Sequence, residues 1–274
     1  MTSTDPHATP ESQTGNFHAE GRTVAGGRGW DWIVEAYALF RRQPGMWILI
    51  MLLALILFIA ISAIPVLGSL ANTLLLPIFG AGLMLGCKAL DQGGTLELAH
   101  LFAGFKQRTG DLVLVGVFNL VCWVVIIFAV FAVVGGGVVM GMMRGGLPGA
   151  GISIASMLIA LLLVAGLSVP LYMATWFAPA LIVLHNVTPG AALKASFFAC
   201  LRNWIPFLVY SVALLMAGLV AAIPLLLGFV VYGVVLLVFG IVAAIPLLLI
   251  FLVLVSVLAA SVYTAYRDIF RAES

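Results

Sequence analysis

The chain has 274 residues, of which 64% are hydrophobic and 8% are charged, whereas a soluble domain has about 25% charged residues. So little polar surface excludes a water-soluble fold, and a net charge of +2 without a basic patch argues against a nucleic-acid partner. The three cysteines are far apart and form no CxxC pair, so neither a disulfide framework nor a zinc site is indicated. We expect no metal ion and no cofactor.

The N-terminal segment, residues 1–29, is polar and rich in Gly, Ser, Thr and Pro, which predicts a disordered tail. The following sequence contains four runs without Asp, Glu, Lys or Arg, at 43–87, 112–143, 145–193 and 203–266. About 20 apolar residues cross a bilayer as one helix, so each run holds one or two crossings. The predicted fold class is an all-α polytopic transmembrane helix bundle over residues 30–266.

Six crossings are predicted, arranged as three hairpins. The first four are expected at 46–65, 70–89, 112–134 and 152–184, and the last two lie within 203–266. Gly82 and Gly86, four residues apart in the second crossing, permit close helix packing. The glycine-rich stretch 135–151 is predicted to be a loop because it contains Pro148.

Prolines complicate the two longest apolar segments. As a straight helix, segment 152–184 would be about 50 Å long. That exceeds the roughly 30 Å hydrocarbon core, so Pro170 and Pro179 should kink or end the helix. In the last run the sequence AAIPLLL occurs twice. Its prolines, Pro224 and Pro246, offer breaks that would divide the run into three short helices instead of two long ones.

Charge favours six crossings over seven and predicts the orientation. With six crossings, all of the 12 Lys and Arg residues except Arg144 lie on one side of the membrane. Basic residues are retained on the cytoplasmic side. The protein is therefore expected in the bacterial inner membrane, with the N-terminus and the C-terminal tail 267–274 in the cytoplasm. A seventh crossing would export Arg267 and Arg271.

A charged island with helical patterning precedes each hairpin. The three islands are 31–44, 96–110 and 192–206, and they divide the bundle into pseudo-repeats 30–90, 95–184 and 188–266. The apolar stripe of the first island consists of Ile33, Ala36, Tyr37 and Phe40. Such stripes predict amphipathic helices in the inner headgroup region. The side chains expected to contact lipid headgroups are Arg41, Arg42, Lys106, Arg108 and Arg202. Membrane lipids are the expected partners, and docking of a protein at the cytoplasmic face is the alternative.

The sequence contains no GxSxG, HExxH or Walker A motif, and we expect the protein not to be an enzyme. Lys88, Asp91 and Asp111 stand at the ends of crossings, which argues against ion-coupled transport. A candidate intramembrane polar cluster consists of Asn119, Ser168, Tyr172 and Thr175. Candidate residues at the cytoplasmic face are His185, Asn186, Arg267 and Asp268. Asn119 either bonds a neighbouring helix or lines a cavity, and His185 either caps a helix end or binds a ligand.

Four segments resemble a known family. They are GRGWDWIVEAYALFRRQPGMW (27–47), WFAPALIVLH (176–185), SFFACLRNWIPFLVY (196–210) and SVYTAYRDIF (261–270). These segments are similar to the uncharacterised BPSS-type family of proteobacterial six-helix inner-membrane proteins, and the resemblance covers most of residues 28–270. It implies a polytopic inner-membrane location and carries no activity, cofactor or catalytic residue. The chain departs from the family in its glycine-rich stretch 135–151 and in the duplicated AAIPLLL.

The sequence therefore favours a non-enzymatic scaffold, assembly or envelope-homeostasis protein that acts through lipid contacts. A polar, water-wide tunnel through the bundle would count against this hypothesis. The alternative is a transporter or channel for an apolar or lipid-like solute, since proline-broken helices line binding sites in many transporters. That alternative predicts a closed cavity near the middle of the membrane, lined by the polar cluster around Asn119.

Overall fold

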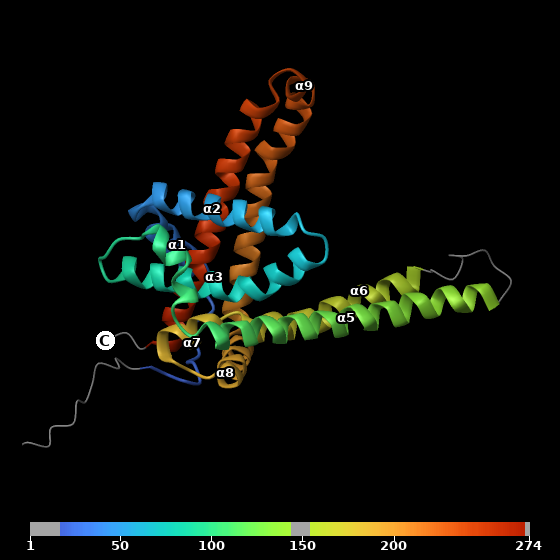
Figure 1. Ribbon diagram of the computed structural model, residues 1–274, viewed down its shortest axis with the longest axis horizontal. Helices are drawn as coiled ribbons and strands as arrows, with labels where there is room; N and C mark the ends of the chain where they lie inside the picture. Colours follow the sequence, from blue (N-terminus) through green and yellow to red (C-terminus); the bar gives the residue numbers. More distant parts are fainter. Residues whose placement is uncertain (1–16, 144–153, 272–274) are drawn as a thin grey trace, which may run out of the picture.

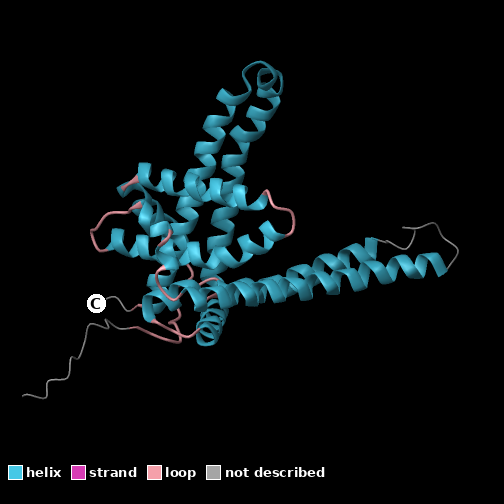
Figure 2. Ribbon diagram, viewed as in Figure 1, coloured by secondary structure: helices cyan, strands magenta, loops and turns pink. Residues whose placement is uncertain are grey.

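The computed structural model describes residues 17–143 and 154–271, apart from the side chains at 154–155, 221 and 223–244. The described residues are helical and connected by short loops (Figure 2). Their one β contact is an isolated bridge between Phe17 and Arg271. The helices are α1 (Arg28–Arg42), α2 (Pro44–Ser62), α3 (Leu67–Asp91), α4 (Leu98–Leu101), η1 (Ala103–Phe105), α5 (Thr109–Met143), α6 (Ile154–Thr175), α7 (Ala178–His185), α8 (Pro189–Arg202) and α9 (Trp204–Phe270).

The predicted all-α polytopic bundle is confirmed. Within the described residues, five helical segments are long and apolar enough to cross a membrane. They are Pro44–Ser62, Leu67–Asp91, Thr109–Met143, Ser156–His185 and Ile245–Phe270. A sixth span results if α8 and the first part of α9, which meet at an angle of 81°, count as one broken span. The structure thus contains five or six candidate crossings by length and composition.

Three helical hairpins project from the base, and in Figure 1 the α9 hairpin points upward while the α2–α3 and α5–α6 hairpins both extend to the right. They are formed by α2 with α3, by α5 with α6, and by the two arms of α9. Helix α9 spans 67 residues, and neither Pro224 nor Pro246, at which the sequence offers breaks, ends it. The hydroxyls of Tyr210 and Ser261 are nevertheless only 2.7 Å apart. A straight helix would separate these residues by about 75 Å, so α9 folds back on itself as a two-armed hairpin.

The predicted loop at 135–151 is wrong in its first part. Helix α5 continues through Gly135 and Gly136 and ends at Met143, whereas the remainder of the stretch, with Pro148, lies outside the described residues. Glycine lowers helix propensity in water, but in an apolar environment an unpaired backbone group costs more than the lost propensity. Helical hydrogen bonds therefore persist across the glycines.

The two prolines of the fourth crossing behave differently. Pro179 stands in the first turn of α7, so the expected break before it is confirmed. Pro170 lies inside α6, which does not end there. The break between α6 and α7 is bridged from outside by the buried Ser196 of α8, whose Oγ donates to Met173 O (2.7 Å) and accepts from Phe177 N–H (3.0 Å).

The prediction of a disordered tail over 1–29 is wrong for its second half. Residues 17–27, which we term the strap, lie across the C-terminal end of α9, and α1 already begins at Arg28. The backbone N–H groups of His18 and Arg22 donate to Phe270 O (2.9 Å) and Ile269 O (2.8 Å). Polar composition suggested disorder, but these long-range bonds hold the segment in place. Residues 1–16 lie outside the described part of the chain.

Two of the three predicted amphipathic helices form as α1 and α8, whereas the 96–110 island forms only the short α4 and η1. This middle segment lies directly against α3. An added Cβ at Gly82 would be 2.3 Å from His100 O, and one at Gly104 would be 2.1 Å from Ile78 O. The close packing expected at Gly82 is therefore present, and its partner is the 98–105 segment.

Helix α1 packs its apolar side against α9. The predicted stripe is therefore only partly available to lipid. Ala36 and Phe40 of that stripe are buried, together with Trp32, whereas Tyr37 is exposed. Two side chains of α9 fix this register: Thr264 Oγ1 donates to Trp32 O at 2.8 Å, and Asp268 accepts from the Trp32 indole N–H at 2.9 Å. Periodicity alone could not show which helix α1 would meet.

Candidate functional site

Asp268, near the end of α9, is the centre of an ionic network at the base. Its carboxylate is 4% exposed and accepts hydrogen bonds from Arg22 Nη2 (2.9 Å), Arg28 Nε (2.7 Å) and Trp32 Nε1 (2.9 Å). Arg22 belongs to the strap and Trp32 to α1. One carboxylate therefore joins the N-terminal segment, the first helix and the last helix.

The network extends along α1 toward α3. Arg28 bonds Glu35 (2.9 Å), Glu35 also bonds Arg267 (2.7 Å), and Arg267 reaches Asp91 at the end of α3 (2.6 Å). Partial burial by itself would lower the pKa of Arg28, but hydrogen bonds and charge from Asp268 and Glu35 outweigh it and raise the pKa above its ordinary value. These groups are mutually neutralised, which suits a structural clamp more than a reactive centre.

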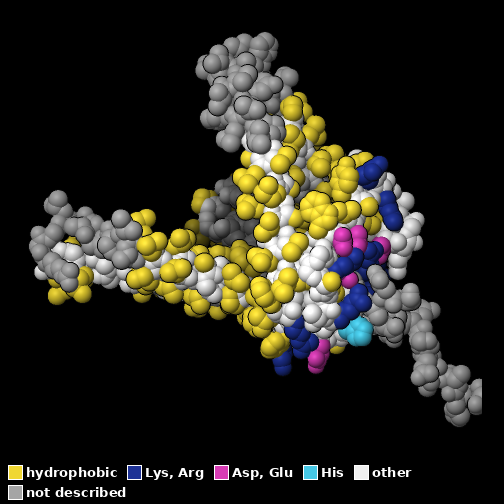
Figure 3. Space-filling view, turned by 180° about the vertical axis from the view of Figure 1, so that it is seen from behind, with side chains coloured by type: hydrophobic (Ala, Val, Ile, Leu, Met, Phe, Trp, Pro, Cys, Tyr) yellow, Lys and Arg dark blue, Asp and Glu magenta, His cyan; other side chains and the backbone are white. Residues whose placement is uncertain are grey.

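The charged side chains gather at one end of the molecule, next to the strap, while the projecting arms are covered by hydrophobic side chains (Figure 3). All four candidates for the cytoplasmic face lie at this base. Arg267 and Asp268 belong to the ionic network. His185 stacks on Phe17 with 3.7 Å between ring centroids and hydrogen-bonds the Tyr266 hydroxyl. Asn186 ends α7 in a left-handed conformation with φ of 56°.

The five candidates for lipid-headgroup contact divide into two groups. Three of them have protein partners: Arg108 pairs with Asp111, Arg202 with Glu20, and Arg42 with the Leu90 carbonyl. Arg41 lies over the ring of its neighbour Tyr37 (5.9 Å to the centroid). Lys106 has no hydrogen bond or ion pair to a described residue. Arg41, Arg42 and Lys106 are thus the three members whose charges have no ionic partner within the described part of the chain.

The candidate polar cluster is largely brought together in an apolar cleft of about 440 Å³, which we term the central cleft. Helices α3, α5, α6, α7 and the second arm of α9 form its walls. Asn119, Tyr172 and Thr175 line it, as predicted. Ser168 does not. It is partly buried further along α6 and bonds its own helix at Ala165 O (3.4 Å).

The polar groups of the central cleft are not equally satisfied. Thr175 donates to Leu171 O (3.0 Å) within its own helix, and Thr73 likewise donates to Ser69 O (2.9 Å). The side chains of Asn119 and Tyr172 make no hydrogen bond to any residue that the structure describes. No charged residue lines the cleft among the described side chains. The cleft is thus neutral, and the side chains of Asn119 and Tyr172 are available to hydrogen-bond a guest.

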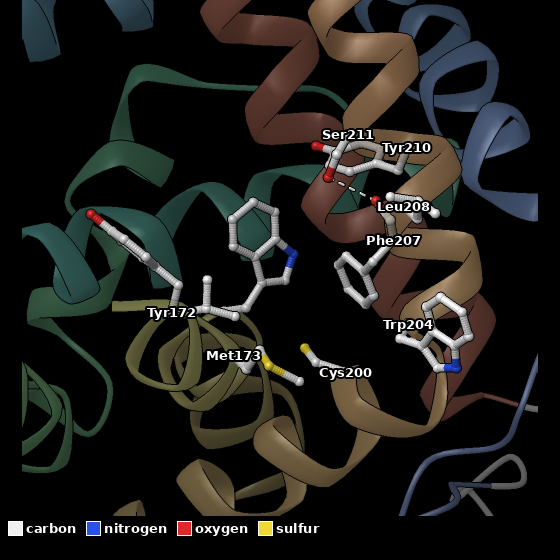
Figure 4. Close-up of a pocket in the computed structure, with 10 residues that line it drawn as sticks. Tyr172, Met173, Cys200, Trp204, Phe207, Leu208, Tyr210 and Ser211 are labelled. Atoms are coloured by element: carbon white, nitrogen blue, oxygen red, sulfur yellow. Dashed lines mark hydrogen bonds between the residues drawn. The ribbon is translucent and has the colours of Figure 1, made fainter. Parts of the chain in front are cut away.

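A second apolar cleft of about 360 Å³ lies between α6, α8 and the first arm of α9 (Figure 4). It shares Tyr172 and Trp176 with the central cleft. In Figure 4 the Tyr172 hydroxyl points away from Cys200 and Phe207 on the far side of this second cleft. Tyr172 therefore lines both clefts, and its hydroxyl lies on the side away from the second cleft.

Sequence reasoning missed the aromatic walls of the central cleft. Trp123 is four residues after Asn119 on α5, and its ring meets Tyr172 edge-on at 6.4 Å between centroids. The spacing of four residues was the signal that placed Trp123 and Asn119 on one helix face. Trp176 could not be recognised because it stands in the break between α6 and α7. Its indole N–H is buried without a hydrogen-bond partner among the described residues.

A probable inner membrane protein of Burkholderia thailandensis is 30% identical to this chain over 197 residues, which cover 69% of this chain and 73% of the relative. The chain belongs to the family of this inner-membrane protein. The match agrees with the expected membership of an uncharacterised inner-membrane family and, with the apolar helices, makes the chain a multi-pass integral membrane protein. No family model matches the sequence, and no solved structure matches it.

Proposed function

We propose that this protein is a non-enzymatic scaffold of the bacterial inner membrane that binds a lipid-like molecule in the central cleft, with both termini in the cytoplasm. The main observation in favour of this proposal is the central cleft. It is neutral, mostly apolar and lined by the two polar side chains of Asn119 and Tyr172 that lack protein partners. Pockets for small molecules have this composition, and their volumes begin near 300 Å³.

The ionic network supports the scaffold part of the proposal. Catalytic groups need freedom to exchange protons or attack a substrate, whereas Arg22, Arg28 and Asp268 are engaged with one another at the base. Among the described residues no group of His, Cys, Asp or Glu is arranged to hold a metal ion. A base built in this way joins the strap and α1 to the ends of α3 and α9, and we assign binding to the central cleft.

Transport of a lipid-like solute is the second candidate. It is favoured by the shared wall of the two clefts, because Tyr172 and Trp176 line both and a guest could pass from one to the other. The central cleft accommodates either function, since a carrier must also bind its solute. The expected closed cavity is replaced by a cleft at the protein surface, where the ring of Tyr172 is 49% exposed.

Cleft binding is tested with a photoactivatable, diazirine-bearing fatty acid and the purified full-length protein. We expect saturable labelling of peptides that contain Asn119 or Tyr172. Gly80→Leu fills the cleft, because an added Cβ there meets no atom within 4 Å, and it should abolish this labelling. Gly166→Leu is the matched control: it also meets no atom within 4 Å, but it lies on the exposed side of α6. Labelling that is non-saturable and spread evenly along α5 and α6 would contradict the proposal.

A further inference from the structure

The polar groups of the central cleft lie along the apolar helices and well away from the charged base. Asn119 is ten residues after the start of α5 at Thr109, which places it about 15 Å along the helix axis from the base. Lys106 and Arg108, the nearest basic residues in the sequence, stand before that start. An ionic headgroup at the depth of Asn119 would have no partner in the neutral cleft wall, and burying an unpaired charge is strongly unfavourable. The polar part of a guest at this depth is therefore uncharged.

The side chains of Asn119 and Tyr172 also define the polar chemistry of that guest. An amide N–H₂ and a phenolic O–H both donate hydrogen bonds, and neither has an acceptor among the described residues. An unsatisfied donor in hydrocarbon costs several kcal/mol, so each gains from an acceptor supplied by the guest. Carbonyl oxygens are acceptors that carry no charge.

The remaining wall of the cleft favours a flat guest. Trp123, Tyr172 and Trp176 line the cleft together with Asn119, and the rings of Trp123 and Tyr172 meet edge-on. Aromatic rings pack well against other planar rings in stacked or edge-on arrangements. A flexible acyl chain gains contact area from such a wall, but it has no planar face to stack on the aromatic rings.

We propose that the central cleft binds a membrane quinone, a neutral planar ring with carbonyl acceptors and an apolar tail, with Asn119 and Tyr172 donating to the carbonyl oxygens. This inference rests on the proposed function, because it names the class of the lipid-like guest. The inference concerns binding of the ring. The tail extends from the open side of the cleft into the surrounding lipid.

The test is a titration of the purified full-length protein in detergent with decylubiquinone, followed by quenching of tryptophan fluorescence. We expect saturable quenching from Trp123 and Trp176. Asn119→Leu and Tyr172→Phe each remove one donor at nearly constant volume, and each should weaken binding about five- to tenfold, the value of a single hydrogen bond. Ser168→Ala is the matched control, since Ser168 lies on α6 outside the cleft, and it should leave binding unchanged. Thermal unfolding verifies that each variant is folded.

Competition separates this inference from the proposed function. Decylubiquinone should displace the photoactivatable fatty acid from the cleft peptides. If the fatty acid labels the cleft saturably and decylubiquinone does not displace it, the quinone assignment is wrong while lipid binding stands. If neither probe shows saturable binding, both proposals are wrong. Equal quenching in the wild type and in the two donor variants would show partition into the micelle and would overturn the quinone assignment.

Discussion

Asp268 is the residue at which the two ends of the chain meet. Its buried carboxylate neutralises Arg22 and Arg28, which lie 246 and 240 residues away in the sequence. Removal of one partner from a buried ion pair costs about 3–5 kcal/mol. The cost here is lower because the two arginine side chains are 35% and 28% exposed and recover part of their hydration.

The substitution Asp268→Asn should therefore lower the free energy of unfolding by about 2–3 kcal/mol. The measurement is unfolding of the detergent-solubilised protein by heat or by denaturant. Asp31→Asn is the control, because the Asp31 side chain is 49% exposed and 3.4 Å from Arg28, and exposed pairs contribute at most about 1 kcal/mol. Equal losses in the two variants would show that burial of Asp268 has no stabilising role.

Three of the four predicted cluster residues meet in the cleft, and the fourth shows what a sequence pattern omits. Ser168, Tyr172 and Thr175 share one side of α6, because they follow helical spacing. Helical phase determines the side of a helix but not how far along it a neighbour extends. The cleft has walls only where α3 and α9 lie beside α6, and Ser168 is beyond that point. Divergence of the hairpins, a long-range property, decides which polar residues form a site.

At the scale of elements, the break between α6 and α7 depends on a side chain from a third helix. Ser196 of α8 is fully buried and satisfies a carbonyl of Met173 and an N–H of Phe177. A helix interrupted inside the membrane needs such a substitute for its lost backbone bonds. Pro179 indicated the break in the sequence, but no sequence pattern connected it to Ser196.

Ser196→Ala leaves both backbone groups without a partner and should destabilise the fold by about 1–3 kcal/mol. The midpoint of thermal unfolding in detergent reports the loss. Ser211→Ala provides the comparison, since that hydroxyl is exposed and bonds Phe207 O in its own helix, and its effect should remain within about 0.5 kcal/mol. A midpoint for Ser196→Ala that matches that of Ser211→Ala would mean that the break is stable without its bridge.

The elements themselves were predicted unevenly. Apolar runs located the crossings within a few residues, because hydrophobicity over 20 residues is a local property. The end of α5 was misplaced because glycine and proline rules derive from water-exposed chains. The strap was missed because its order comes from Asp268, at the opposite end of the sequence.

At the scale of the whole molecule, the predicted orientation is open to a direct test. Alkaline phosphatase is active only outside the cytoplasm, whereas green fluorescent protein is fluorescent within it. Since basic residues favour the cytoplasmic side, a phosphatase fused after Ser274 should be inactive and the fluorescent fusion at the same point should be bright. A phosphatase inserted after Arg144 should be active. An active phosphatase after Ser274 would invert the orientation or change the number of crossings.

The hairpins also differ in length. Helix α2 has 19 residues and is about 28 Å long, close to the hydrocarbon thickness, whereas α5 has 35 residues and is about 52 Å long. Apolar helices longer than the bilayer core adapt by tilting or by bending. We therefore expect α5 to be tilted or bent in the bilayer.

If all three hairpins cross the bilayer from the base, the molecule is a wedge within it, because the hairpins start together and end apart (Figure 1). Such a body displaces few lipids in the leaflet at its base and many in the leaflet at its tips. A flat membrane must stretch one leaflet and compress the other to enclose it. A membrane that is convex on the side of the tips would relieve this mismatch, and we expect the protein to bind preferentially to membrane of that curvature.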